Sequence, residues 1–162
     1  MSLTFQPPGD VQPVTSMHLQ ERTLKDVAIS HAREEIGEAT YDARNWQFFP
    51  GASGTISRVD LTIILSIKMP VWDNYRARPR QEMQEWDRFY RALLEHEKGY
   101  IQIIRREAQA MYAAMMQATP GTIQAVYDAG IEQISRLNAE YDSQTDHGRR
   151  QNTVHGSTMI TI

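Results

Sequence analysis

The feature that most constrains the fold of this chain is a long helical pattern between residues 81 and 117. Apolar side chains recur there at three- and four-residue spacing, which places them on one face of an α-helix. Gly99 interrupts the pattern and costs about 1 kcal/mol relative to alanine. The stripe is predicted to be core, and it comprises Trp86, Phe89, Tyr90, Leu93, Tyr100, Ile104, Ala108, Met111 and Met115.

A second long helix is predicted directly after the first. Thr119 and Pro120 form a good helix start, with threonine at the N-cap and proline at the first helical position. Helical spacing then continues through Ile123, Val126, Tyr127, Ile131, Ile134, Leu137 and Tyr141. Residues 151–162 are expected to form a polar, irregular C-terminal tail.

The N-terminal part of the chain is expected to begin with a flexible arm over residues 1–13, which are rich in proline, glycine and glutamine. A short extended segment is expected from residue 14 to residue 19. A first helix is then predicted over residues 22–37, with Thr23 as its N-cap and Gly37 at its end.

Two strands are predicted in the middle of the chain. Residues 40–50 mix aromatic and polar side chains, GASG at 51–54 forms a turn, and residues 55–72 are rich in β-branched side chains with near alternation. The predicted fold is therefore α+β, with an N-terminal helix, a small antiparallel sheet and two long C-terminal helices. Residues 14–150 are expected to form a single domain.

Composition excludes several classes of function. The net charge of −3 and the 23% of charged residues argue against a nucleic-acid-binding protein. No apolar run approaches the length of a membrane span. The chain has no cysteine, so any metal must be held by nitrogen and oxygen ligands. The N-terminus shows no signal-peptide pattern.

The segment EHEKGY, residues 95–100, places an imidazole and a carboxylate on or beside the apolar stripe of the long helix. A buried carboxylate needs a hydrogen-bond donor, a cation or a metal. Zinc proteases use the pattern H-E-x-x-H, in which residues four apart reach one ion and the glutamate is the catalytic base. His96 and Glu97 fit this pattern, but Tyr100 stands at the second histidine position.

A third ligand would have to come from elsewhere in the chain, and His147 is the first candidate. His18, His31 and His155 are weaker candidates. The alternative without a metal is an ordinary half-buried pair of hydrogen-bonded side chains on a long helix.

Two longer segments strengthen the metal interpretation. The helix segment WDRFYRALLEHEKGYIQI resembles the pattern W-x-x-Y-x-x-x-L-x-x-H-E-x-G-H-x-x-I, with Tyr100 at the second histidine position. The residues that fit are Trp86, the aromatic pair Phe89-Tyr90, Leu93, His96, Glu97, Gly99 and a downstream isoleucine. The segment EYDSQTDHGRRQ fits Y-D-x-x-T-x-H-G. With the strand that ends in IKMPVW, they cover residues 20–150 in order. This arrangement resembles the bacterial family of predicted secreted zinc-dependent proteases known as domain of unknown function 922.

The resemblance implies a zincin-like active helix, a zinc site that includes His96 and His147, Glu97 as the catalytic base, and a secreted or periplasmic location. Three interpretations of Tyr100 stay open. Its phenolate binds zinc; or a carboxylate such as Asp142 or Asp146 takes its place as a ligand; or the metal is lost and Tyr100 is a hydrogen-bonded remnant. We favour the third, because phenolate ligands are rare and buried tyrosines with a bonded hydroxyl are common.

The resulting hypothesis is a zinc-metallopeptidase-like protein with a degenerate metal site and weak or no hydrolytic activity. The alternatives are an active zinc-dependent peptidase and a non-catalytic module that binds a peptide or protein. The sequence names no substrate and gives no oligomeric state.

Overall fold

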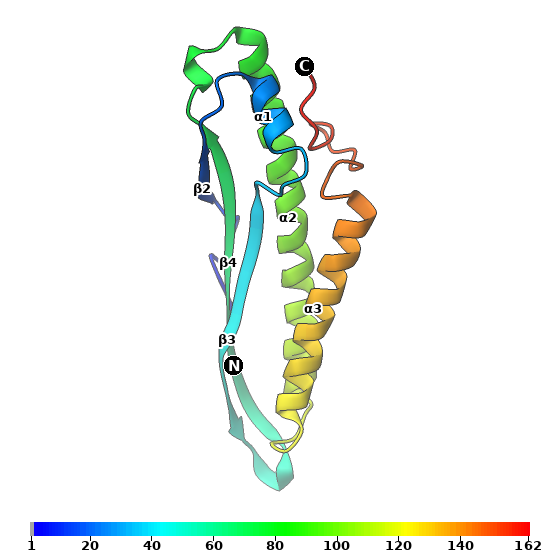
Figure 1. The fold of residues 1–162 in the computed structure, drawn as a ribbon. Coiled ribbons are helices and arrows are strands. Elements are labelled where there is room, and N and C mark those ends of the chain that lie inside the picture. Colours follow the sequence, from blue (N-terminus) through cyan, green and yellow to red (C-terminus); the bar gives the residue numbers. More distant parts are fainter. Residues whose placement is uncertain (1) are drawn as a thin grey trace. The chain divides into compact units, whose positions relative to one another are not determined.

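A computed structural model describes residues 2–162 of the chain. Two short 3-10 turns accompany the main elements, at Ala52–Gly54 and Tyr75–Ala77. In chain order the elements are β1 (Ser2–Gln6), β2 (Pro13–Leu19), α1 (Leu24–Ser30), β3 (Glu38–Pro50), β4 (Ile56–Trp72), α2 (Arg80–Met116) and α3 (Ile123–Thr145) (Figure 1).

The described chain divides into two compact units that are interleaved in sequence. Residues 2–11, 40–65 and 100–140 belong to the first unit, and residues 12–39, 66–99 and 141–162 belong to the second. The first part of β4 and the second part of α2 belong to the first unit, and the rest of both elements belongs to the second unit.

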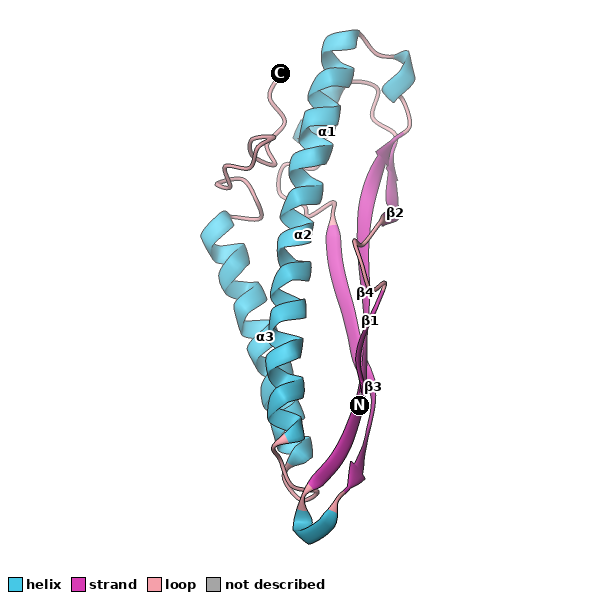
Figure 2. Ribbon diagram, turned by 180° about the vertical axis from the view of Figure 1, so that it is seen from behind, coloured by secondary structure: helices cyan, strands magenta, loops and turns pink. Residues whose placement is uncertain are grey.

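Strand β4 is the central strand of the sheet. β1 pairs with it in parallel in the first unit, with Leu3 opposite Leu61. β2 pairs with it in parallel in the second unit, with Leu19 opposite Trp72. β3 also pairs with β4, and the strands are coloured magenta in Figure 2.

The predicted antiparallel sheet is therefore wrong, and so is the helix as the N-terminal element. Two strands precede α1, and both pair with β4 in parallel. Near alternation of apolar residues gives the buried face of a strand but not the direction of its partner, so the sequence pattern could not reveal these pairings. The two long C-terminal helices and the mixed α+β content agree with the sequence prediction.

The first helix is shorter than predicted. Thr23 caps it as expected, since its side chain accepts a hydrogen bond from the amide of Asp26 at 3.1 Å. The helix ends at Ser30 instead of continuing to Gly37. The imidazole of His31 lies 2.7 Å from the carboxylates of Glu21 and Glu34, and these two contacts hold the chain in a turn at this point.

In the first unit, the helical residues between 100 and 140, which belong to α2 and α3, pack on β3 and β4. The hydroxyl of Tyr127 donates to the carbonyl oxygen of Ala43 at 3.0 Å, and that of Tyr112 donates to Val59 at 3.2 Å. Helices α2 and α3 approach closely at Gly130, where a Cβ would lie 2.3 Å from Met111. The buried core of this unit includes Val59, Leu61, Ile63, Ile104, Ala108, Met111, Met115, Ile123 and Ile134.

The second unit has its own core, built from α1, β2, β4 and the first half of α2. The indole rings of Trp72 and Trp86 lie 5.6 Å apart, and the indole N–H of Trp72 donates to the carbonyl oxygen of Glu21 at 2.8 Å. The core of this unit includes Leu19, Leu24, Val27, Ile67, Met69, Trp72, Trp86, Phe89 and Leu93. Among the described residues, no helix has the length and apolar character needed to cross a bilayer.

The alternation of burial along β4 gives a direct test of the fold. Ile63 is fully buried, whereas its neighbour Ile64 is 45% exposed. Ile63→Ala should lower the free energy of unfolding by about 2–5 kcal/mol, and Ile64→Ala by less than about 1 kcal/mol. Urea denaturation of the two variants measures both values, and equal losses would contradict the assigned faces of β4.

Candidate functional site

Helix α2 buries two polar side chains in succession. His96 is 2% exposed and Glu97 is 4% exposed, although their sequence neighbours Glu95 and Lys98 are only partly buried. The sequence predicted this position on or beside the apolar stripe, and the structure confirms it. Since isolated buried polar groups are costly, their surroundings determine what the pair can do.

The imidazole of His96 is held in one orientation. Its Nδ1 lies 2.9 Å from the side-chain oxygen of Gln151, which can only accept a hydrogen bond. Nδ1 therefore carries the proton, and Nε2 is the acceptor atom of the neutral ring. Burial lowers the pKa of His96 and so favours the neutral form, which is the form that binds metals.

The ring of Tyr141 covers the imidazole. The two ring centroids lie 5.0 Å apart and the planes are inclined by 14°. The tyrosine hydroxyl donates to the carbonyl oxygen of His96 at 3.0 Å and also lies 3.3 Å from the side-chain oxygen of Gln151. One side chain at the end of α3 thus contacts both His96 and the residue that orients it.

Gly99 makes this contact possible. A Cβ at position 99 would lie 2.1 Å from the hydroxyl oxygen of Tyr141, a distance that two unbonded atoms cannot adopt. The glycine that interrupts the helical pattern of α2 is therefore required by packing, which outweighs its low helix propensity.

His147 is positioned by the irregular end of α3. The hydroxyl of Thr145 donates to the carbonyl oxygen of Tyr141 at 2.7 Å and accepts from the amide of Gly148 at 3.3 Å. Three successive residues then adopt left-handed backbone angles: φ is 48° at Asp146, 55° at His147 and 86° at Gly148. This turn places Gly148 against His96, where a Cβ would lie 3.1 Å from Cγ of the imidazole.

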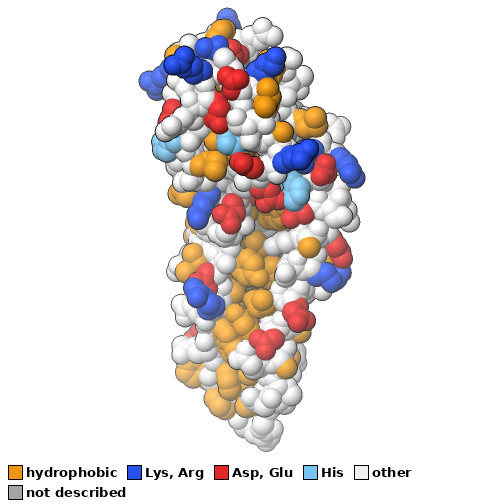
Figure 3. Space-filling view, in the orientation of Figure 1, with side chains coloured by type: hydrophobic (Ala, Val, Ile, Leu, Met, Phe, Trp, Pro, Cys, Tyr) orange, Lys and Arg blue, Asp and Glu red, His pale blue; other side chains and the backbone are white. Residues whose placement is uncertain are grey.

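Two carboxylates contact the imidazole of His147. Its Nδ1 pairs with a carboxylate oxygen of Glu35 and lies 3.2 Å from Oδ1 of Asp142. Glu35, Asp142 and His147 each have one potential metal-ligating atom within 4.8 Å of those of the other two, so the group could hold a metal ion. Histidine and acidic side chains gather together on this face of the second unit (Figure 3).

A cavity of about 370 Å³ brings the candidate residues together. His96, Glu97, His147 and Glu35 line it, and all four belong to the second unit. The remaining wall is largely apolar and includes Val27, Ile36, Phe89, Leu93, Met159 and Ile160. The cavity therefore combines imidazole and carboxylate groups with an apolar surface, as ligand sites commonly do.

Burial raises the pKa of Glu97 to about 8, and the negative charges of Glu35, Asp142 and Glu38 add to the increase. A hydrogen bond from the backbone of Ala39 opposes the shift. When no cation is bound in the cavity, Glu97 therefore holds a proton at neutral pH. A cation bound in the cavity would favour the ionised carboxylate.

The other candidate residues are distributed differently. Tyr100 follows His96 by four residues on α2, is half-buried, and belongs to the first unit. His31 lines the cavity but is paired with Glu21 and Glu34. His18 pairs with Asp73, and Asp146 lies 3.8 Å from Arg149. His155 lies in the tail after α3, where its backbone amide bonds to Thr153.

Sequence reasoning missed two residues of the site, Glu35 and Gln151. Glu35 lies in a charged segment, AREE, for which the sequence predicts a helix, and Gln151 lies in the predicted tail. Neither belongs to a motif, and only the folded chain places them next to His147 and His96.

The family model described as "Bacterial protein of unknown function (DUF922)" matches residues 12–148. The chain belongs to this family. The match contains His96, Glu97, Tyr100 and His147, and it ends at Gly148. No curated protein and no solved structure matches the chain. Membership in DUF922 thus confirms the family that the motifs indicated, while the family description assigns no activity.

The contact between Gly99 and Tyr141 predicts an unusual substitution effect. Gly99→Ala should destabilise the protein by about 1–3 kcal/mol through overpacking, although alanine is the better helix former. Combined with Tyr141→Ala, the same substitution should cost much less. A double-mutant cycle measured by urea unfolding tests this, and additive effects would contradict the contact.

The pKa of Glu97 predicts how stability changes with pH. Between the ordinary value of 4.5 and the value of about 8, the folded state keeps a proton that the unfolded state releases. The free energy of unfolding of metal-free protein should therefore fall as pH rises through this range, by up to about 1.4 kcal/mol per pH unit.

Glu97→Gln should remove most of this pH dependence, because glutamine does not titrate. Urea unfolding at pH 5 to 8 with a chelator present measures the slope, and Glu132→Gln, which removes an exposed carboxylate, is the matched control. The same slope in wild type and Glu97→Gln would show that another group is responsible.

Proposed function

We propose that this DUF922 protein is zinc-metallopeptidase-like, with a degenerate metal site in the cavity of its second unit. In this proposal His96 and His147 are the zinc ligands and Glu97 is the acid–base residue. The observation that carries it is that two histidines from distant segments line one cavity beside a buried glutamate, each with Nδ1 held by an oxygen acceptor.

The donor set is compatible with zinc. Zinc prefers imidazole nitrogen and carboxylate oxygen when no thiolate is present. Zinc-bound histidines commonly donate their second ring N–H to a carboxylate or an amide oxygen, which fixes the ring and raises its basicity. Gln151 is placed to do this for His96, and Glu35 with Asp142 for His147.

The third protein ligand is the degenerate part of the site. Tyr100 stands where the family pattern has histidine, and its phenol is a poor ligand unless it loses its proton. Glu35 and Asp142 offer carboxylate oxygens close to His147 and are the alternative ligands, but they now contact Nδ1 of that ring, and His96 does not belong to their group. A ligand set that combines either carboxylate with both histidines therefore requires these side chains to rearrange when metal binds. We therefore expect weaker zinc binding than in a site with three histidines, and weak or no hydrolysis of peptides.

Glu97 is suited to move a proton in such a site. Zinc, when bound, supplies Lewis-acid polarisation and makes a water molecule more acidic. The ionised carboxylate of Glu97 can accept a proton from water and later donate it to the leaving amine. The buried surroundings that raise the pKa of Glu97 also make the carboxyl group a competent proton donor near neutral pH.

A second candidate function is peptide binding without turnover. Tyr100 favours it, because replacing one of three strong ligands lowers metal affinity by orders of magnitude, while the apolar wall of the cavity is unaffected. In that case the protein would keep the cleft of a peptidase and use it as a binding module.

Zinc stoichiometry separates these functions. Untagged protein purified without chelator and re-equilibrated with zinc should hold about one zinc ion per chain, and His96→Ala and His147→Ala should both abolish binding. Gln151→Ala should weaken it about tenfold by releasing the His96 ring. His18→Ala, which removes a largely exposed histidine of the same unit, is the control.

Tyr100→His tests the degenerate position directly. Tighter zinc binding together with new peptidase activity that Glu97→Gln abolishes would support a degenerate peptidase scaffold. No zinc in the wild type, combined with uptake in Tyr100→His, would favour the binding module. No zinc in either protein would exclude the metal site.

A further inference from the structure

The segment after the matched family region forms an ordered structure beside the cavity. We refer to residues 153–161 as the strap. It begins with a turn in which the hydroxyl of Thr153 donates to the carbonyl oxygen of Gly156 at 2.6 Å and accepts from the amide of His155 at 3.1 Å. Gly156 has a φ of 82°, which suits glycine and closes the turn.

The guanidinium of Arg88 holds the strap to α2 through backbone carbonyl groups. Nη1 donates to the carbonyl oxygens of His155 and Ser157, each at 2.9 Å, and Nη2 donates to that of Met159. Nε and Nη2 also bond to the carboxylate of Glu85, at 2.8 and 2.7 Å. All five N–H groups of the guanidinium are thereby used, three of them on the strap.

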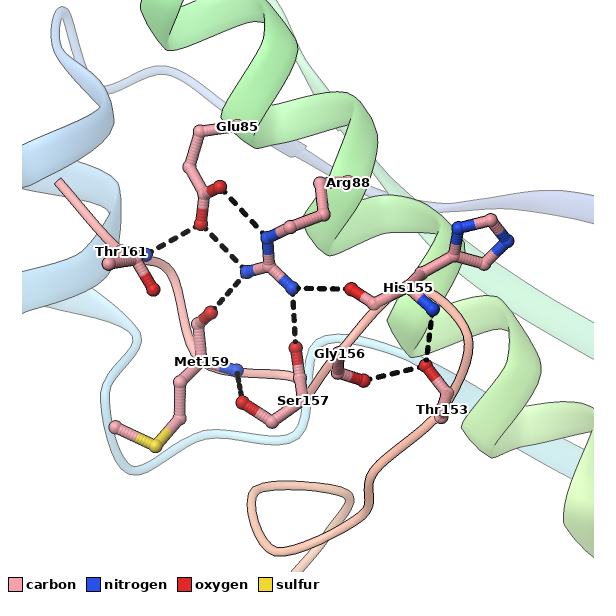
Figure 4. Close-up of polar contacts among 8 residues, drawn as sticks. All are labelled: Glu85, Arg88, Thr153, His155, Gly156, Ser157, Met159 and Thr161. Atoms are coloured by element: carbon pink, nitrogen blue, oxygen red, sulfur yellow. Dashed lines mark hydrogen bonds and ion pairs between the residues drawn. The ribbon is translucent and has the colours of Figure 1, made fainter.

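Glu85 completes the contact from the other end. Its Oε1 accepts a hydrogen bond from the amide of Thr161 at 2.6 Å. Backbone groups of alternate residues, 155, 157, 159 and 161, therefore face one ion pair on α2, as Figure 4 shows. None of these bonds involves a side chain of the strap, so the pair recognises main-chain groups and not a particular sequence.

The opposite side of the strap contacts the segment that carries His147. The hydroxyl of Thr158 donates to the carbonyl oxygen of His147 at 2.9 Å, and the amide of Thr158 donates to that of Gly148 at 3.2 Å. Thr158, Met159 and Ile160 line the same cavity as His96 and Glu97. The strap is therefore one wall of the candidate site.

We propose that Glu85 and Arg88 form a binding site for the main chain of a peptide, and that the strap occupies this site as an internal competitor. The inference rests on the proposed function, because it gives the cavity a peptide ligand. An incoming peptide supplies the same carbonyl and amide groups, so it can replace the strap bond for bond. Since Val27, Phe89 and Leu93 line the cavity, the preferred peptides carry apolar side chains at the positions of Met159 and Ile160.

The strap is held in a way that permits such exchange. None of its residues is fully buried and Met159 is 55% exposed, so the strap buries apolar surface chiefly at Ile160 and is held largely by hydrogen bonds. Arg88 and Glu85 keep their mutual ion pair when the strap leaves, and only three donors and one acceptor need new partners. Water or a peptide can provide them.

The test uses a variant that ends at Val154 and a labelled peptide with the sequence of residues 155–162, HGSTMITI. Binding is measured by fluorescence anisotropy in chelator, so that zinc does not contribute. The shortened protein should bind the peptide at least tenfold more tightly than the full chain. A peptide with Met159 and Ile160 replaced by serine should bind more weakly, and so should one with Thr158 replaced by valine, whereas exchanging the other side chains should have little effect.

Arg88→Lys in the shortened protein isolates the main-chain contacts. Lysine keeps the charge but not the planar set of donors, so peptide affinity should fall about tenfold or more. Arg91→Lys, an exposed arginine on the same helix, should leave affinity unchanged. A folded shortened protein that does not bind the peptide, or equal affinity in the Arg88→Lys and Arg91→Lys variants, would overturn the proposal.

A full-length variant covers the case in which the shortened protein does not fold. Thr158→Val with Thr161→Pro removes two strap contacts without shortening the chain. It should bind the peptide more tightly than wild type, and unchanged binding would again overturn the proposal. Because these measurements are made without zinc, they can fail while the zinc stoichiometry succeeds, and the reverse.

Discussion

The candidate site depends on the contact between Tyr141 and Gly99. It lets an aromatic ring lie flat on His96 and places a hydroxyl against the backbone of α2. The end of α3, the left-handed turn at residues 146–148 and Gln151 all follow Tyr141 closely in sequence, so this contact determines where they meet α2. Without the glycine, His147 and the residue that orients His96 would lose their common anchor. A Cβ at position 99 would thus force the ring of Tyr141 away from its present position on His96.

The buried carboxyl of Glu97 is a feature that stability alone does not explain. An apolar side chain of similar size would remove the desolvation cost, and the surrounding carboxylates make the ionised form still less favourable. Strongly perturbed carboxyl groups in a cavity are typical of functional sites, although structural networks also produce them. Here the glutamate lies between an oriented histidine and a cluster of acidic groups, and a bound cation would relieve the unfavourable charge. The same residues whose charges oppose ionisation of Glu97 are those expected to favour a metal ion in the cavity.

The sequence predicted some parts of this structure and could not predict others. The stripe of α2, the cap at Thr23 and the burial of His96 and Glu97 followed from local periodicity and spacing, because one helix fixes which of its own residues share a face. The segment that fits Y-D-x-x-T-x-H-G also made His147 a candidate metal ligand. The parallel pairing of β1 and β2 with β4, the early end of α1 and the roles of Glu35 and Gln151 depend on contacts between distant segments. No local pattern marks such contacts, so the sheet direction was predicted wrongly.

The site and the strap share Thr158, whose bonds to His147 and Gly148 connect them physically. Any movement of the strap would release the carbonyl oxygen of His147 and uncover Gly148, the residue that packs on the ring of His96. If a peptide displaces the strap from Glu85 and Arg88 as proposed, both imidazoles would gain freedom to move. A peptide that restores the contact of Thr158 would leave the histidines in place, and one that does not would loosen them. Under this proposal, peptide binding in the cavity would change the geometry of the candidate metal ligands.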